Sequence, residues 1–206
     1  MSRKNVSHST YAVSLYFDGE SASKISCCVK RTAEAGENFY LTEHEVPPHM
    51  TLGVFHASDD ELEKLKSLFK EFASTMGRAF TVGFDGADSF LDKVIFLCIS
   101  EESRAHLAGL NSILHNLMLS AFEAGDNRNY LPQNWVPHVA LAVKLNSVQF
   151  KSGMNFLKAH NELIPTVANV VSIGLARCNP YEEITRISLR AGCDSLLETF
   201  RFLCQI

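Results

Sequence analysis

The sequence contains one five-residue pattern twice, Pro-His-x-x-Leu, first at residues 48–52 and again at residues 137–141. Each copy follows a polar loop and begins an apolar run that predicts a β-strand, with proline at the strand's first position. Around the two copies the same order of elements occurs, namely strand, helix, histidine strand, helix, strand. We therefore expect an internal duplication that places His49 and His138 at equivalent points.

The elements themselves follow from hydrophobic periodicity and from turn residues. In the first unit these signals predict strands at residues 11–17, 49–55 and 80–84, and helices at residues 20–35 and 58–76. In the second unit the same signals predict strands at residues 94–99, 138–145 and 167–175, and helices at residues 101–123 and 147–162. A strand at residues 184–189 and a short helix near residues 195–203 remain. Ser58 and Glu61 have the spacing of a capping box at the start of the second helix.

This order favours an α/β (α+β) fold, in which mostly antiparallel sheets are backed by helices. We expect one bilobal domain over residues 11–206, with a cleft between its two lobes, after a disordered segment at residues 1–10.

Composition excludes several classes of protein. The net charge is −4, from 19 basic and 23 acidic residues, which argues against broad binding to duplex nucleic acid. Six cysteines without a CxxC pair indicate a reducing compartment, so we expect a cytoplasmic protein. The sequence has neither the apolar core of a signal peptide nor a run of about 20 apolar residues, and we expect no membrane association. It carries no information on oligomeric state, and a monomer is the working expectation.

The two histidine strands have the alternation needed to line a cleft. His49 and Thr51 share one face of the first strand, while Met50 and Leu52 share the other and can be buried against helices. If the repeats pack about a pseudo-twofold axis, His49 and His138 face each other. Histidine suits both general acid and general base roles near neutral pH, and a threonine hydroxyl can donate to a phosphate oxygen. This chemistry requires no metal.

The tetrapeptides His49-Met50-Thr51-Leu52 and His138-Val139-Ala140-Leu141 resemble the signature of the 2H phosphoesterase superfamily, which includes the 2′-5′ RNA ligase-like proteins and cyclic nucleotide phosphodiesterases. That signature is two copies of His-x-Thr/Ser-x, one in each half of a duplicated bilobal α/β fold. The resemblance implies that His49 and His138 are catalytic and that Thr51 contacts phosphate. It also implies an enzyme without metal or cofactor that acts on 2′,3′-cyclic phosphates or 2′-5′ linkages of RNA ends and small nucleotides.

The second copy departs from the signature, because Ala140 stands where the hydroxyl is expected. Loss of one such hydroxyl would remove about 1–3 kcal/mol of transition-state stabilisation, which corresponds to roughly ten- to a hundredfold in rate. Lys144 shares the face of His138 by strand parity and could replace the hydroxyl. Alternatively, Ala140 marks a member of the same fold that binds RNA ends or nucleotides without turnover.

The loop before the second motif, residues 126–136, contains Arg128, Tyr130 and Trp135. An arginine for phosphate and aromatic rings for base stacking would suit a nucleotide end, although a packed surface loop has the same composition. The closing strands carry three arginines that either line the cleft or are solvated, namely Arg177, Arg186 and Arg190. We expect no metal site, since His44, His49 and His56 lack a ligand-like spacing and a completing cysteine or carboxylate. A structural domain with unrelated histidines is the remaining alternative.

Overall fold

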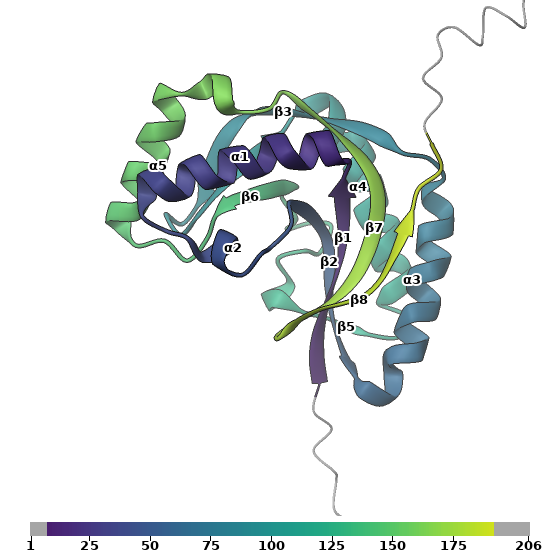
Figure 1. Ribbon diagram of the computed structural model, residues 1–206. Coiled ribbons are helices and arrows are strands. Elements are labelled where there is room, and N and C mark those ends of the chain that lie inside the picture. Colours follow the sequence, from purple (N-terminus) through teal and green to yellow (C-terminus); the bar gives the residue numbers. More distant parts are fainter. Residues whose placement is uncertain (1–7, 192–206) are drawn as a thin grey trace, which may run out of the picture.

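The computed structural model describes residues 8–191, which form one antiparallel sheet of eight strands with helices packed on it (Figure 1). The strands are β1 His8–Phe17, β2 His49–Ser58, β3 Phe80–Phe90, β4 Val94–Ile99, β5 Glu123–Ala124, β6 His138–Ala142, β7 Val167–Cys178 and β8 Tyr181–Ser188. The α-helices are α1 Gly19–Gly36, α2 Tyr40–Glu43, α3 Leu62–Met76, α4 Glu101–Met118 and α5 Ser147–Ala159. Short 3-10 turns follow at η1 Asp59–Glu61, η2 Asp126–Arg128 and η3 Asn161–Leu163.

The sheet order confirms the duplication. Its strands run β5-β2-β1-β7-β3-β4-β6, with β8 paired to β7. The triplet β2-β1-β7 therefore corresponds to the triplet β6-β4-β3, and the β7–β3 pair joins them. The third strand of each repeat has been exchanged, because β3 extends the strands of the second repeat and β7 extends those of the first. We call β1, β2, β7 and β8 the first lobe, and β3, β4 and β6 the second lobe.

The register of the strand pairs shows which residues of the two lobes occupy equivalent positions. In the first lobe, Tyr16 lies opposite His49 and Ser14 lies opposite Thr51. In the second lobe, Cys98 lies opposite His138 and Phe96 lies opposite Ala140. The two histidine strands thus meet their neighbours in the same alignment, and differences between the lobes are differences of side chain.

Helices of each repeat cover the histidine strand of the other repeat. Helices α1 and α5 pack against each other and α1 lies on β6, whereas α3 and α4 pack against each other and α4 lies on β2 (Figure 1). The alternate residues Met50, Leu52, Val139 and Leu141 are no more than 1% exposed beneath them. Burying a side chain of this kind contributes about 1.5–3 kcal/mol, so a one-residue slip of either strand would be strongly destabilising. This burial turns His49 and His138 to the opposite face.

Local signals place most element boundaries. Asp18 caps α1 by accepting from the Ser21 amide at 2.7 Å, and the capping box of Ser58 and Glu61 is formed as expected. Helix α4 ends at Met118 rather than at residue 123, because residues 123–124 pair with β2 as strand β5. Strand β6 ends at Ala142 and α5 ends at Ala159, both three residues earlier than expected.

Two expectations concern the chain ends, namely a disordered segment at residues 1–10 and a short helix near residues 195–203. Strand β1 begins at His8 and pairs with β2 from that residue, so residues 8–10 are part of a strand and not of a disordered segment. The first seven residues of that segment, and the short helix expected near residues 195–203, lie outside the described residues.

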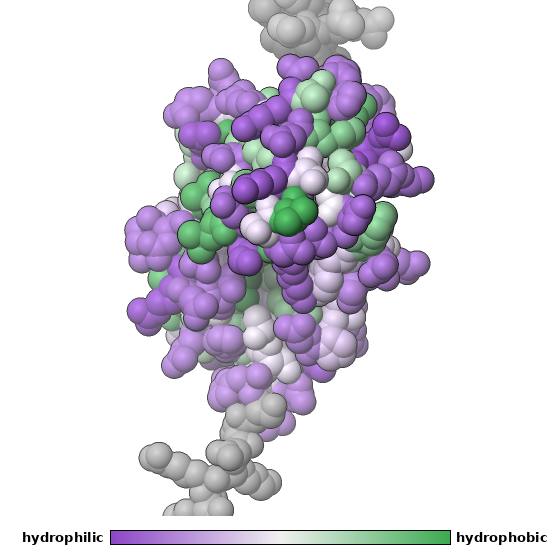
Figure 2. Space-filling view, turned by 90° about the vertical axis from the view of Figure 1, so that its left-hand side faces the viewer, coloured by the Kyte–Doolittle hydropathy of each residue, from purple (hydrophilic) through white to green (hydrophobic). Residues whose placement is uncertain are grey.

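The face in Figure 2 is mainly hydrophilic, with hydrophobic side chains in small, separate areas. No helix between residues 8 and 191 is long and apolar enough to cross a membrane. The cysteines of that range are free thiols, namely Cys27, Cys28, Cys98 and Cys178.

Candidate active site

The two motif histidines are held in the same way. His49 begins β2 and its Nδ1 lies 2.8 Å from the carbonyl oxygen of Pro47. His138 begins β6 and its Nδ1 lies 2.7 Å from the carbonyl oxygen of Val136. A carbonyl oxygen only accepts hydrogen bonds, so in each ring Nδ1 carries the proton and donates it. In the neutral rings Nε2 is then left with a free lone pair, as a general base requires.

Both histidines line one cavity of about 580 Å³. Its wall includes Thr51 and Ala140, which follow the histidines at the same distance in sequence, and it also includes Tyr130 and Trp135. A second hollow of about 430 Å³ continues from His49 and Thr51 along β1 and β7 of the first lobe. The two histidines therefore lie in the middle of an extended cleft.

The environment lowers the pKa of both imidazoles. Burial is the main cause for each, because it disfavours the charged ring, while the hydrogen bond to the backbone carbonyl acts in the opposite direction. A further decrease in the pKa of His49 comes from the positive charge of Arg186, and in that of His138 from His49. Phe90 and Phe96 pack on His138, with ring centroids 5.0 and 5.2 Å away. Both rings are therefore uncharged at neutral pH, and protonation of one opposes protonation of the other.

Hydroxyl groups gather beside His49. The Thr51 Oγ1 lies 3.2 Å from the Ser14 Oγ, and the Tyr130 hydroxyl is hydrogen-bonded to Thr51. Burial, reinforced by the negative charge of Asp126, raises the pKa of Tyr130 to about 12, so this phenol stays protonated and can donate. These three hydroxyls form a polar cluster that could bind an oxyanion.

Arg186 on β8 brings a positive charge that acts on His49. Its guanidinium lies 3.7 Å from the centroid of the Tyr16 ring and forms an ion pair with Glu183. The register places Thr51, Ser14, Gly174 and Arg186 in one row across four strands. A Cβ at Gly174 would stand 2.7 Å from the Tyr16 ring, so glycine is required there for the ring to lie where it does. Sequence alone left Arg186 among three equivalent arginines because the register of β8 could not be read from it.

The loop before the second motif is fixed to β2. The buried Asn111 of α4 donates from Nδ2 to the carbonyl oxygens of Leu52 and Tyr130, at 2.7 and 2.9 Å. The Trp135 indole donates to the carbonyl oxygen of Thr51 at 3.1 Å, so its polar edge is used within the fold. Tyr130 and Trp135 thus line the cavity that contains the two histidines. No sequence pattern distinguished Asn111, which lies on the apolar face of a helix.

Two expected contributors are placed elsewhere. Arg128 is exposed in η2 and does not line the cavity that contains the histidines. Lys144 lies beyond the end of β6 with φ of 55°, and its Nζ is 4.0 Å from the centroid of the Tyr40 ring. Strand parity therefore does not extend to residue 144, and the expectation that Lys144 faces the cleft with His138 is wrong.

The remaining motif-adjacent histidines have local partners. His44 stacks on Tyr40 at 4.1 Å between centroids, and His56 Nδ1 lies 3.3 Å from the Thr10 hydroxyl. Within residues 8–191, no three side chains of His, Cys, Asp or Glu are grouped so that they could hold a metal ion.

Comparison with known proteins places the chain in a family. The family model described as the 2′-5′ RNA ligase superfamily matches residues 30–179, which is more than half of the chain. E. coli LigT complexed with 3′-AMP is 18% identical, with a TM-score of 0.57, and the match covers 89% of this chain and 99% of LigT. Usb1 of Kluyveromyces marxianus is 15% identical, with a TM-score of 0.51, over 88% of this chain and 98% of Usb1.

A third solved structure, a phosphoesterase, is 17% identical with a TM-score of 0.55, over 88% of this chain and 99% of its own. No curated protein matches the chain. The structural neighbours share the fold over most of the chain, and the residues matched by the family model, 30–179, include both histidine motifs. The chain therefore belongs to the 2′-5′ RNA ligase superfamily, within the 2H phosphoesterases that its motifs resemble.

Proposed function

We propose that this protein is a phosphodiesterase that acts, without a metal, on 2′,3′-cyclic phosphate or 2′-5′-linked ends of RNA or small nucleotides. His49 and His138 are its general acid and base, and Thr51 binds the phosphate. Membership of a phosphoesterase superfamily supports phosphodiester chemistry in general. The neighbours solved with 3′-AMP, NADP+ and ATP support a nucleotide as ligand.

The proposed reaction balances with one water molecule. The Nε2 of one neutral imidazole takes a proton from water, whose oxygen attacks phosphorus. The P–O bond to the leaving oxygen breaks, and the other histidine gives a proton from Nε2 to that oxygen; because both rings are uncharged at neutral pH, this histidine must first take up that proton from solvent. The hydroxyls of Thr51, Ser14 and Tyr130 stabilise the charge that develops on the non-bridging oxygens.

One observation carries this proposal: both imidazoles line one cavity, and each is fixed through Nδ1 to a carbonyl two residues earlier. The test is turnover of a 2′,3′-cyclic nucleotide and of a 2′-5′ dinucleotide, with and without a chelator. We expect turnover that the chelator does not change. Activity that disappears with the chelator, or turnover that remains intact without either histidine, would contradict the proposed mechanism.

The second candidate function is a protein that binds RNA ends or nucleotides with little or no turnover. The observation that favours it is the second lobe, where Ala140 and Phe96 stand at the positions of Thr51 and Ser14. Titration calorimetry with a nucleoside 3′-monophosphate, beside the turnover assay, separates the two functions. Binding without product at high enzyme concentration would favour the binder.

A further inference from the structure

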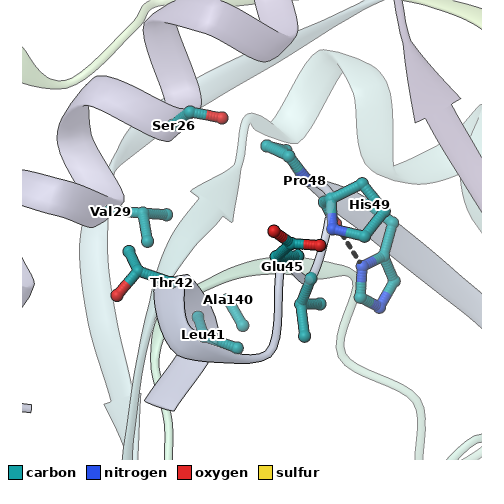
Figure 3. Close-up of a pocket in the computed structure, with 10 residues that line it drawn as sticks. Ser26, Val29, Leu41, Thr42, Glu45, Pro48, His49 and Ala140 are labelled. Carbon is teal, nitrogen blue, oxygen red and sulfur yellow. Dashed lines mark hydrogen bonds between the residues drawn. The ribbon is translucent and has the colours of Figure 1, made fainter. Parts of the chain in front are cut away.

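A separate pocket of about 200 Å³ opens beside the two motifs (Figure 3). Helix α1 contributes Ser26 and Val29, α2 contributes Leu41 and Thr42, and the segment that follows contributes Glu45. His49 and Ala140 line this pocket and also the larger cavity. A substrate whose phosphate lies at His49 could therefore extend past the Ala140 methyl group into the pocket.

Glu45 stands at a backbone position that structure alone would give to glycine. Helix α2 ends in a Schellman motif, in which the Val46 amide donates to Leu41 O at 3.1 Å and the Glu45 amide to Thr42 O at 3.3 Å. Glu45, the first residue after the helix cap, has φ of 50°, in the left-handed region. A glutamate there is strained relative to glycine, and backbone strain of this kind is enriched at functional sites.

The Glu45 carboxylate is available to a ligand. Figure 3 shows it in the pocket, between the side chains of α1 and α2 on one side and His49 on the other. Within residues 8–191 it has neither a hydrogen-bond nor an ion-pair partner. It is therefore an exposed acceptor without a donor from the protein, on the wall of a pocket that adjoins a proposed catalytic histidine.

The wall that carries Glu45 is held firmly. Tyr40 stacks on His44, and the His44 Nδ1 lies 2.8 Å from the Tyr40 carbonyl oxygen. The Lys144 ammonium lies over the Tyr40 ring, 4.0 Å from its centroid. Lys144, which comes from the second lobe, thus ties α2 to the strand that carries His138. The position of Glu45 relative to both motifs is consequently preorganised, which reduces the entropic cost of binding.

We propose that this pocket binds the ribose next to the reacting phosphate, with Glu45 accepting a hydrogen bond from the free hydroxyl beside the phosphate ester. The inference rests on the proposed function, since it requires phosphate at His49. In a nucleotide, the group bonded directly to phosphate is the sugar, and the pocket lies directly beside His49. The apolar side chains of Val29, Leu41 and Pro48 suit the sugar carbons, and carboxylates commonly accept from ribose hydroxyls.

This subsite selects between the two substrate classes of the proposed function. In a 2′,3′-cyclic phosphate both neighbouring oxygens are bonded to phosphorus, so Glu45 has no hydroxyl to accept from. In a 2′-5′ linkage the adjacent 3′-hydroxyl is free. The pocket therefore favours acyclic ribose phosphates, and 2′-5′-linked ends are the preferred substrates.

The experiment compares adenosine 3′-monophosphate with its 2′-deoxy analogue by titration calorimetry, because the two differ only in the neighbouring hydroxyl. The wild-type protein should bind the ribonucleotide about tenfold more tightly, as expected for a hydrogen bond to a charged group. Glu45→Gln keeps only an uncharged oxygen acceptor, so it should reduce this ratio and should not weaken the binding of the deoxy analogue. Glu43→Gln, an exposed position on α2 that does not line the pocket, should keep the wild-type ratio.

A second variant separates binding from folding. Glu45→Gly relieves the left-handed backbone, so it should unfold at no lower temperature than the wild type and still lose the preference for the ribonucleotide. Equal affinities of the wild type for the two nucleotides, or an unchanged ratio in Glu45→Gln, would overturn the subsite and leave the phosphodiesterase proposal intact. If the wild type binds neither nucleotide and turns over neither substrate, the proposed function fails and the subsite fails with it.

Discussion

The two lobes present the same backbone to the cleft and different chemistry. In the first lobe, Thr51 and Ser14 form a cross-strand pair of hydroxyls next to His49. In the second lobe, the equivalent pair is Ala140 and Phe96, next to His138. The two lobes thus share the histidines and their backbone hydrogen bonds, while one side of the cleft is polar and the other is apolar.

The apolar character of the second lobe extends to the edge of the cleft. Phe90 stacks on Phe96 with centroids 4.2 Å apart, and both lie against His138. Leu91, in the turn between β3 and β4, lines the same cavity although it is 92% exposed and has φ of 49°. An exposed leucine in the left-handed region contributes little to folding. The difference between the lobes teaches that the histidines are the symmetric part of the cleft and the hydroxyl groups are the asymmetric part.

The largest expected effects come from the symmetric part. His49→Ala and His138→Ala should each reduce kcat by about 10²–10⁴-fold, because each removes one proton transfer. If the histidines are equivalent in function, the two losses should be of similar size and the double variant should be little worse than either. His160→Ala, an exposed histidine near the end of α5, is the matched control and should retain full turnover. A large loss in only one of the two variants would break the functional equivalence of the lobes.

The next effect concerns the polar lobe. Thr51→Val keeps the shape of the side chain and removes the hydroxyl that lies 3.2 Å from Ser14. We expect kcat/KM to fall by roughly ten- to a hundredfold, which corresponds to about 1–3 kcal/mol of lost stabilisation. Thr81→Val on β3, whose exposed hydroxyl donates to Asn169, controls for removal of a strand threonine. An unchanged kcat/KM in Thr51→Val would show that the hydroxyl pair does not bind phosphate.

A gain should result from repairing the apolar lobe. Ala140→Ser restores a hydroxyl at the position equivalent to Thr51 and adds only one oxygen atom to a residue that lines the cavity. We expect kcat/KM to rise by no more than about tenfold, the lower end of what Thr51→Val loses, because Phe96 offers no hydroxyl partner to orient the new group. Steady-state kinetics on one substrate measures both changes. Turnover that appears only in Ala140→Ser would identify the wild-type protein as the binder, and a decrease would show that the second lobe needs its apolar surface.

Much of this arrangement was predictable because hydrophobic periodicity reports directly on burial. Met50 and Leu52 alternate with His49 and Thr51, so one face had to be buried and the other had to be free. Pairing between distant segments leaves no such local signal. The exchange of β3 and β7 between the lobes, and the row that brings Arg186 to the site, depend on register.

The errors have local causes. Parity placed Lys144 in the cleft on the assumption that β6 continued to residue 145, whereas the strand ends at Ala142 and residue 144 is left-handed. Arg128 also has positive φ, at 65°, in a turn whose shape the composition of the loop does not determine. Glu45 was not singled out, because a glutamate at a glycine-type position is recognisable only after the short helix α2 is known.

The smallest expected effect is a dependence of stability on pH that both lobes share. Burial holds the pKa of His49 and His138 below the value of about 6.5 that they have in an unfolded chain. As pH falls below about 6.5, the unfolded chain therefore binds protons that the folded protein does not, and the free energy of unfolding decreases.

His138→Gln removes one of these groups, so its free energy of unfolding should decrease less steeply between about pH 7 and pH 5. The buried His115, whose pKa burial also lowers, should retain part of the slope in that variant. Urea unfolding at a series of pH values measures the slopes, and His160→Gln should match the wild type. An equal slope in His138→Gln would mean that the second-lobe imidazole is as well solvated in the folded protein as in the unfolded chain, and that burial does not lower its pKa.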